Sequence, residues 1–506
     1  MRKLLLILLV VMATAAGAQV PVPDTARQAL TYRVEASATA GCGDYAPLWL
    51  TANRQGLSGV ETRSAYVRAG VVWRRELNRG WRVGAGLDLA GTYGQTAPFV
   101  MQQAYADVGW RWGNLSLGSK ERWPEMKDRE LSSGAMVEGG NARPVPQVRL
   151  EIPEYVDVPG TKRWLALKGH IAYGRFTDDR WQRDFAAAGS SYLTDVLYHS
   201  KAIYFRMGRR DRFPLELEFG LLMAAQFGGK VYAYDADRRA QLVYDLPSGL
   251  SDALKMIIPS AGGDDTPAGE QVNVYGNHVG SWNFALTAWP AEGWRVRLYY
   301  EHLFEDHSQM FFQYGRWRDG HIGVQVDFPR NRWLSTLVWE GLGTKDQSGP
   351  ILYDGYAGAM PEYQVSANDD YYNNGLYLGW QHWGMGMGNP LLPGPLYNAD
   401  HVIRFRSNRT LAHHVGLRGE PARDWSWRVL VSYARHWGTY RNPLDDVQRE
   451  VHSLWEVRWS PRRWRGWSAA AALGVDRGSY LGDNTGFQLT VRKDGWLGRN
   501  AKKALR

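Results

Sequence analysis

The stretch "ELNRGWRVGAGLDLAG" (76–91) joins a tight polar turn to a segment in which two kinds of side chain alternate. From Trp81 to Leu89 every second residue is apolar, whereas Arg82 and Asp88 fall on the opposite face. Such period-two alternation indicates a β-strand with two different faces. A polar turn followed by tryptophan and an alternating run recurs at 290–300, 329–339, 421–433 and 461–475.

These alternating runs are long for strands. An ordinary strand has roughly five or six residues, whereas a tilted strand that crosses a bilayer needs roughly nine to eleven. The pattern predicts strands near residues 31–40, 64–75, 81–93, 102–112, 114–121, 146–158, 162–176, 199–209, 214–227, 277–289, 294–303, 319–328, 333–343, 411–420, 425–437, 451–460, 467–478 and 485–493. Every second connection between these strands is short, and the intervening ones are usually longer, notably 121–145, 228–276 and 344–410.

This alternation of short and long connections predicts the fold. It is typical of a transmembrane barrel, with tight turns at the periplasmic end and long loops outside. A closed barrel pairs its backbone groups without a free edge, so lipid is tolerated although the mean hydropathy is −0.42. We therefore predict an all-β fold: a transmembrane antiparallel β-barrel of about 18 strands over residues 31–493, with sixteen or twenty strands as alternatives because boundaries shift by about two to four residues.

The beginning of the chain has the pattern of a signal peptide. Arg2 and Lys3 precede the apolar run 4–13, and residues 16–18 supply the small side chains that a signal peptidase needs. The run is too short for a membrane-spanning helix. We expect export to the cell outer membrane, with a signal peptide at 1–18, a short periplasmic N-terminal segment at 19–30 and a basic C-terminal tail at 494–506.

Composition and motifs disfavour several kinds of function. The formal net charge of +9 favours acidic partners such as lipopolysaccharide or an acidic capsule. Basic residues are spread along the predicted strands and turns, which argues against nucleic-acid binding. His413 and His414 are adjacent, so they point to opposite faces of a strand, and no HExxH spacing occurs. Cys42 is the only cysteine, which excludes an intramolecular disulfide. We predict no catalytic residue, no metal and no cofactor.

Several longer blocks resemble a known family. They are "GDYAPLWLTANRQGL" (43–57), the segment 115–150, "TKDQSGP" (344–350), "YYNNGLYLGWQHWGMGMGNPL" (371–391) and "AHHVGLRG" (412–419). Together they are similar to the capsule assembly Wzi family of Gram-negative outer-membrane proteins, over about residues 32–492. The resemblance implies an outer-membrane barrel that binds surface polysaccharide and helps capsule polymer associate with the cell.

The first candidate binding segment is the long loop at 369–391. It concentrates aromatic residues beside aspartates and asparagines, and aromatic rings can cover the apolar face of a sugar while polar groups bond its hydroxyls. The candidate contacts are Tyr371, Tyr372, Trp380 and Trp383. The alternative is that these rings pack within the loop or form an outer aromatic girdle.

The second candidate is "KERWPEMKDRE" (120–130) together with Arg143. Arg122 and Arg143 could bind carboxylates of an acidic polysaccharide through their planar guanidinium groups, with Trp123 beside them. Glu121, Glu125, Asp128 and Glu130 are interspersed, however. The alternative is therefore salt bridging that orders a loop folded into the lumen.

Three classes of function remain. The favoured one is a monomeric surface protein that binds capsular or extracellular polysaccharide, surrounded by outer-membrane lipid and lipopolysaccharide. The second is a porin-like diffusion channel, whose lumen would be lined by Arg82, Asp88, Lys168, His170, Arg295, Arg297 and Glu301. The third, a hydrolase, has no positive sign in the sequence. The tryptophans that follow the short turns are expected to form a periplasmic aromatic girdle: Trp81, Trp294, Trp333, Trp425 and Trp467.

Overall fold

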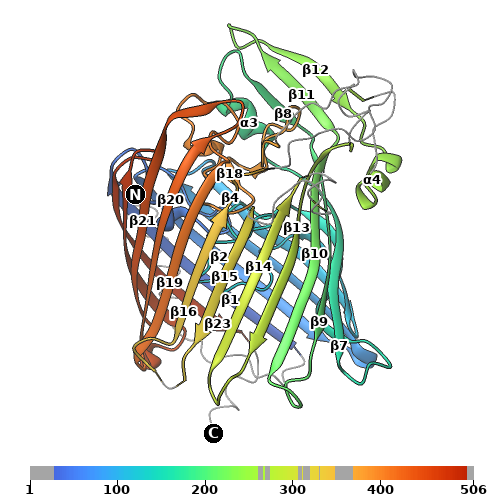
Figure 1. The fold of residues 1–506 in the computed structure, drawn as a ribbon, viewed down its shortest axis with the longest axis vertical. Coiled ribbons are helices and arrows are strands. Elements are labelled where there is room, and N and C mark those ends of the chain that lie inside the picture. The colour runs from blue at the N-terminus through green and yellow to red at the C-terminus, as the bar shows by residue number, and fades with distance from the viewer. Residues whose placement is uncertain are drawn as a thin grey trace.

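The computed structural model describes residues 28–259, 266–267, 274–305, 310, 319–329, 331–347 and 369–497. The expected signal peptide, and the expected flanking segments except 28–30 and 494–497, lie outside the described residues. Within them, one sheet contains eighteen strands: β1 (Gln28–Cys42), β2 (Arg63–Glu76), β3 (Trp81–Tyr93), β4 (Phe99–Trp110), β5 (Gly113–Ser119), β6 (Gln147–Asp157), β7 (Leu165–Arg175), β9 (Leu197–Met207), β10 (Leu215–Phe227), β13 (Asn277–Ala288), β14 (Arg295–Phe304), β15 (Gly320–Asp327), β16 (Thr336–Gly343), β19 (Thr410–Ala422), β20 (Trp425–Gly438), β21 (Pro443–Trp459), β22 (Trp467–Gly478) and β23 (Asn484–Trp496) (Figure 1).

The sheet is a closed antiparallel barrel. Each strand pairs with the next one along the chain, and β1 pairs with β23 from Thr31 opposite Trp496 to Cys42 opposite Thr485. Closure satisfies the backbone without an exposed edge, as a strand structure in lipid requires. The predicted barrel of about eighteen strands is confirmed. Its strands begin three residues before, and end three residues after, the predicted range 31–493, because Gln28 and Trp496 still belong to paired strands.

The outer surface of the barrel is an apolar belt. Leu87 is exposed on the outer face of β3, whereas its neighbour Asp88 points inward and is buried against Arg68. On β5 and β6, Leu117 and Val148 lie opposite each other and both are at least half exposed. Exposed apolar side chains on one face, with polar ones on the other, are the arrangement that lipid and a polar lumen impose on a barrel strand.

The short turns lie at one end of the barrel and carry the expected tryptophans. Four of these tryptophans are exposed and the fifth is half-buried: Trp81, Trp294, Trp333 and Trp425, and then Trp467. Trp294 packs against Phe328 with ring centres 5.4 Å apart, and Trp425 against Trp459 at 6.1 Å. Two short 3₁₀ helices, η1 (Asn78–Gly80) and η3 (Arg462–Trp464), belong to these turns.

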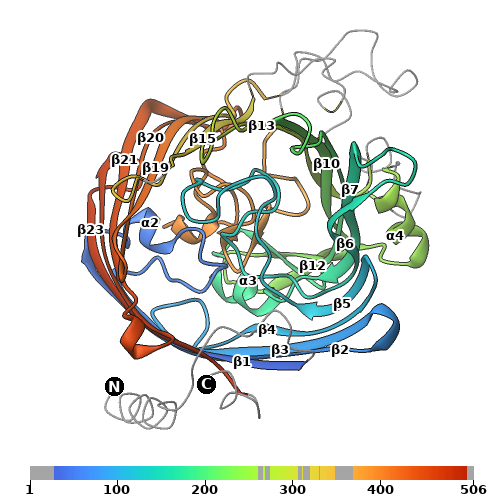
Figure 2. The ribbon, with the colours of Figure 1, turned by 90° about the horizontal axis from the view of Figure 1, so that it is seen from below.

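The opposite end of the barrel is filled by inward-folded loops, seen inside the barrel in Figure 2. We call them the plug, defined as residues 43–62, 120–146 and 369–409. The plug contains the short helix α2 (Leu48–Thr51), the paired strands β17 (Gln381–His382) and β18 (Met385–Gly386), and the 3₁₀ helix η2 (Pro395–Tyr397). Its buried side chains, together with inward-facing side chains of the wall strands, form the main apolar core of the molecule, so the core lies inside the lumen.

A small sheet stands above the barrel at the same end (Figure 1). It pairs β8 (Ser191–Thr194), β11 (Gly229–Tyr234) and β12 (Ala240–Leu246), next to helix α3 (Asp179–Phe185). A further helix, α4 (Leu250–Ile257), lies outside the barrel wall (Figure 2). No helix among the described residues is long and apolar enough to cross a membrane.

Candidate functional site

The plug is attached to the barrel wall by buried polar groups. Glu340 of β16 accepts hydrogen bonds from Ser132 Oγ at 2.6 Å, from the Ser133 backbone N–H at 2.7 Å and from Tyr299 Oη at 2.5 Å. Its side chain is almost completely buried. A buried carboxylate is stable only when it is fully hydrogen-bonded or paired, so these contacts fix the position of residues 132–133 inside the lumen.

The charged segment 120–130 also belongs to the plug. Lys127 pairs with Glu301 of β14 at 2.5 Å, and both side chains are almost fully buried. Asp128 pairs with Arg418 of β19 at 3.1 Å. Salt bridging therefore orders this loop inside the lumen, as the alternative interpretation expected, but the partners lie on wall strands far away in the sequence rather than within the segment.

Three of the aromatic candidates are buried in the plug. Tyr371, Tyr372 and Trp380 have no exposed surface. Trp380 Nε1 donates to the Val137 carbonyl at 2.8 Å, and Tyr372 Oη donates to the Met136 carbonyl. These contacts tie the loop at 369–391 to the other plug loop. The structure thus brings none of these three rings to a surface that a ligand could reach.

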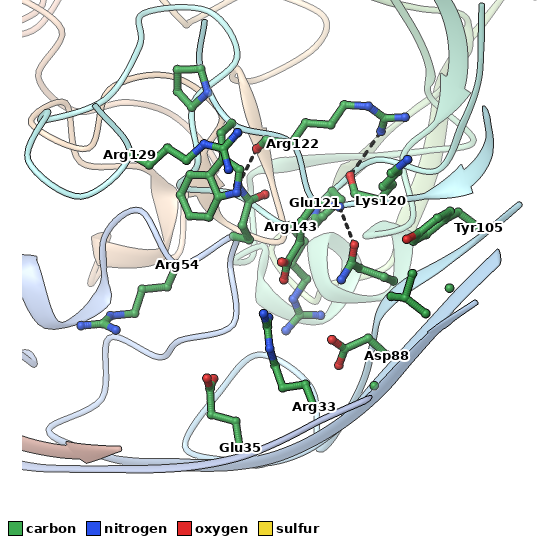
Figure 3. A pocket seen from close by; sticks show the side chains of 18 of the residues that line it. Arg33, Glu35, Arg54, Asp88, Tyr105, Lys120, Glu121, Arg122, Arg129 and Arg143 are labelled. Atoms are coloured by element: carbon green, nitrogen blue, oxygen red, sulfur yellow. Dashed lines mark hydrogen bonds between the residues drawn. The ribbon is translucent and has the colours of Figure 1, made fainter. Parts of the chain in front are cut away.

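Below the plug lies a polar cavity of about 1490 Å³ (Figure 3). Its lining extends from the plug down to Arg465 and Trp496 at the periplasmic turns. Among the sequence-predicted residues, Arg122, Trp123 and Arg143 line it. Asp88, Lys168, His170 and Glu301, which we expected to line a diffusion channel, also face this cavity.

The cavity holds arginines without an acidic partner. No aspartate or glutamate among the described residues forms an ion pair with Arg54, Arg122 or Arg143. Instead, Arg54 Nε donates to the Leu50 carbonyl at 2.9 Å, Arg122 Nη1 to the Lys120 carbonyl at 3.2 Å and Arg143 Nη2 to Thr96 Oγ1 at 2.7 Å. Burial lowers the pKa of Arg143 to about 10 and also lowers the pKa of Arg54 and Arg122.

These three guanidinium groups stay charged at neutral pH and retain free donors. A planar guanidinium offers paired N–H groups to a carboxylate or phosphate, and such bonds are stronger than those between neutral groups. Chemically, the cavity can therefore hold an anionic group. Within the described residues, no group of three or more His, Cys, Asp or Glu side chains could hold a metal ion.

Trp383 connects the cavity to the outer end of the molecule. The Arg143 guanidinium lies 4.4 Å from the centre of the Trp383 ring, so the structure brings these two sequence-predicted residues together. Trp383 is half-buried and packs on the aromatic residues of α3 and the small outer sheet. A cation over the face of tryptophan is attracted by the ring, which holds both side chains in place.

An outer aromatic patch packs on the same buried cluster as Trp383. We define this patch as Phe185, Tyr232, Tyr234 and Trp383, which are all half-buried and pack on the cluster of Trp181, Ala186, Tyr192 and Ile403. Tyr192 supports it from below and stacks on Tyr232 with ring centres 5.1 Å apart. The patch is rimmed by exposed cations: the Arg238 guanidinium lies 5.0 Å from the Tyr234 ring and donates to the Arg183 carbonyl at 3.0 Å.

Of this patch, the sequence predicts only Trp383. Phe185 ends α3, and Tyr232 and Tyr234 belong to β11, so proximity in the chain does not reveal them. The alternating "VYAYD" at 231–235 is the signal that could have predicted them, since Tyr232 and Tyr234 share one face of a strand.

Comparisons with known proteins find one family and several solved structures similar to this chain. The model of the family described as capsule assembly protein Wzi matches residues 53–388. Among solved structures, Wzi of Escherichia coli, an outer-membrane protein involved in group 1 capsule assembly and a carbohydrate-binding β-barrel, is 14% identical with a TM-score of 0.55, covering 97% of this chain and 87% of that one. OccAB4 of Acinetobacter baumannii is 10% identical with a TM-score of 0.47, covering 94% of this chain and 100% of that one. No curated protein matches the chain.

Proposed function

The chain belongs to the capsule assembly protein Wzi family and is an outer-membrane β-barrel, and on this premise we propose that it binds capsular or extracellular polysaccharide at the cell surface and assists capsule assembly and attachment. The carbohydrate binding of Wzi from Escherichia coli, which shares the fold, supports this proposal. The expected partners are polysaccharide and the surrounding outer-membrane lipid, including lipopolysaccharide, and the barrel acts as a monomer.

The outer aromatic patch is the observation that carries the proposal. The elements that carry its four residues, which are α3, β11 and the turn between β17 and β18, lie at the end of the barrel opposite the tryptophan-bearing turns (Figure 1), and this is the extracellular end of such a barrel. Half-exposed rings can stack on the apolar faces of sugars, and the arginines around them can bind sugar hydroxyls and carboxylates. We assign Trp383 and Arg143 to this site, and Tyr371, Tyr372 and Trp380 to the packing that supports it.

Arg122 and Trp123 line the inner cavity, which we propose as a second contact region for the polysaccharide. Both residues belong to the plug and line the cavity that extends from it to the periplasmic turns, so they would contact an acidic sugar only if it entered from the periplasmic end. The cationic lining favours a polysaccharide that carries carboxylate or phosphate groups. An acidic capsule is therefore the substrate class that fits both the outer patch and the cavity.

Binding of purified protein to capsular polymer from the same cell tests the proposal. Removing two rings with the double substitution Trp383→Ala and Tyr234→Ala is expected to weaken binding roughly tenfold or more, since about 1.4 kcal/mol of lost contact energy corresponds to that factor. Trp333→Ala is the matched control, because this exposed tryptophan lies at the opposite end of the barrel. Unchanged affinity of the double variant would remove the patch from the proposal.

We further propose that the chain binds polymer without cleaving it. The outer patch supplies aromatic rings and cations, whereas hydrolysis of a glycosidic bond commonly requires two suitably spaced carboxyl groups at the bond. Incubation with purified protein should leave the length distribution of the polymer unchanged. Shortened polymer, abolished by substitutions in the cavity, would favour the hydrolase alternative.

A further inference from the structure

Helix α4 carries apolar side chains on two different faces. One face packs on the outside of the barrel wall, where Met256 and Ala253 contact Phe227 and Tyr173. The other face is exposed and consists of Leu250, Leu254, Ile257 and Ile258, with exposed fractions of 81%, 56%, 36% and 76%. The first three follow the i, i+4, i+7 spacing of one helix face. Water would be a poor environment for a stripe of this kind.

The polar groups of α4 do not interrupt this stripe. Asp252 is buried and accepts a hydrogen bond from the Gly249 backbone N–H at 3.0 Å, and Lys255 pairs with Asp252 at 3.1 Å. The helix is therefore capped and charge-compensated through its own residues. Away from the barrel the helix presents mainly this apolar stripe, with the exposed Ser251 beside it.

Polar anchors fix α4 to the lipid-facing side of the wall. Lys201 of β9 points outward and its Nζ donates to the last carbonyls of the helix, Met256 at 2.7 Å and Ile257 at 2.6 Å. Tyr173 Oη of β7 donates to the Ala253 carbonyl at 2.6 Å. A cation on the C-terminal carbonyls is the favourable arrangement for a helix end. The helix is thus an attached part of the barrel exterior, as its position in Figures 1 and 2 shows.

The height of α4 along the barrel matches the outer boundary of the membrane. Its contact residues Ala225 and Phe227 lie eight and ten residues beyond Leu217, an exposed residue near the periplasmic turns. With a rise of about 3.4 Å per residue and a strand tilt of about 40°, this corresponds to roughly 20–26 Å along the membrane normal, compared with an apolar band about 25 Å tall.

The apolar belt continues at the level of α4 on the neighbouring strands. Val148 of β6 lies directly opposite Tyr173, which is under α4, and Val148 is 50% exposed. Leu117 of β5, opposite Val148, is 58% exposed. The outward stripe of α4 is therefore continuous with the surface that already faces acyl chains.

We propose that α4 is an in-plane interfacial helix whose stripe of Leu250, Leu254, Ile257 and Ile258 inserts among the acyl chains of the outer leaflet. Interfacial helices of this kind lie along the membrane with an apolar face buried at the boundary between headgroups and chains. The helix would anchor the outer sheet, to which it is joined through residues 247–249, to the membrane surface. The inference depends on the barrel fold and is independent of polysaccharide binding.

Spin labels on α4 test the assignment in proteoliposomes. The full-length Cys42→Ser protein receives a single nitroxide through Leu254→Cys or, separately, through Leu250→Cys. Leu117→Cys is the lipid control, and Arg239→Cys, on an exposed outer hairpin, is the water control. The ratio of collisions with oxygen to collisions with a water-soluble nickel chelate is measured by electron paramagnetic resonance. At both α4 positions the ratio is expected to be close to the value at position 117 and clearly higher than the value at position 239.

Two results would overturn the proposal. One is a collision ratio at both α4 positions equal to that at position 239, which would place the stripe in water. The other is low collision with both reagents, which would mean that protein covers the stripe. Heat-modifiable migration in gels verifies that each variant is a folded barrel, and Leu250→Cys removes the least packing because its side chain is 81% exposed.

Discussion

Lys127 and Glu301 illustrate how single residues hold the plug. Lys127 Nζ contacts Glu301 Oε2 at 2.5 Å, the Gly134 carbonyl at 2.9 Å and His321 Nδ1 at 2.6 Å. Removal of one partner from a buried pair leaves an uncompensated charge, which typically costs about 3–5 kcal/mol. Lys127→Met is therefore expected to destabilise the plug by an amount of this order, seen as faster hydrogen exchange of residues 127–137 in the folded barrel.

The exposed pair Arg163–Asp157 provides the matched control for Lys127→Met. Its side chains are 76% and 45% exposed. Such surface pairs contribute about 0–1 kcal/mol, so Arg163→Met should leave the exchange of residues 127–137 unchanged. Equal exchange in both variants and the unsubstituted protein would contradict the role of Lys127 in fixing the plug.

Asp319 gives the plug a dependence on pH. Burial raises the pKa of Asp319 to about 6, although the backbone N–H groups of Asp346 and Gln347 and the Tyr371 hydroxyl oppose this shift by donating to its carboxylate. Because the folded-state pKa lies above the unfolded value, protonation contributes stability that is complete below about pH 4 and is lost as pH rises through about 6, on the order of 3 kcal/mol.

Denaturant unfolding followed between pH 4 and pH 7 measures this effect. The free energy of unfolding is expected to fall across that range in the unsubstituted protein, and the fall should be smaller in Asp319→Asn, which cannot titrate. Any offset in stability that is the same at every pH reports the altered hydrogen bonds of asparagine instead. Parallel pH profiles for the two proteins would rule out Asp319 as the titrating group.

At the scale of elements, the strands follow from the sequence and the plug does not. Lipid faces one side of each barrel strand and a polar lumen faces the other, so apolar and polar residues alternate, as Leu87 outside and Asp88 inside illustrate. The local sequence pattern therefore predicts the strands. Plug residues obey no such period, because their partners are distant: Trp380 bonds to Val137, 243 residues away. Aromatic rings beside polar residues also look alike at a membrane rim and in a polar interior, so the burial of Tyr371 could not be predicted.

The candidate site was predictable only in part, because local composition is visible in the sequence whereas contacts between distant residues are not. Composition predicts the charged segment 120–130 and the loop at 369–391, and the structure brings Arg143 and Trp383 together. The remaining rings of the outer patch come from α3 and β11, which the sequence pattern did not separate from the surrounding loops. Helix α4 had a readable signal in "LSDALKMI" (250–257), whose apolar residues follow helical spacing.

We expect the plug to determine whether the barrel conducts. Residues 370–408 fill part of the lumen and pack on the other plug loops. Their replacement by a short Gly-Ser linker is expected to raise the single-channel conductance in planar bilayers well above that of the intact barrel, which should pass little current. Replacement of the outer hairpin turn 235–239 by the same linker is the control and should not change the conductance. High conductance of the intact barrel would instead favour the diffusion-channel alternative.

At the scale of the whole molecule, the two ends of the barrel differ in structure. The periplasmic end carries short turns with exposed tryptophans that suit the membrane interface, whereas the outer end carries the plug, the small sheet and the aromatic patch. Trp383 belongs to both the plug and the patch, and a ring that is already fixed in place would reduce the entropy cost of binding a long polymer at the proposed site. The structure therefore favours an attachment point on the outer surface over a passage through it.

The amount of capsular polymer retained by cells tests this account most directly. Polymer in the cell-attached and released fractions is measured in a strain that lacks the protein and in strains that express either the unsubstituted chain or the Trp383→Ala and Tyr234→Ala double variant. The account predicts that deletion shifts polymer into the medium, that the unsubstituted chain restores attachment and that the double variant, present at equal amounts in the outer membrane, does not. Full attachment of polymer in the deletion strain would contradict the account.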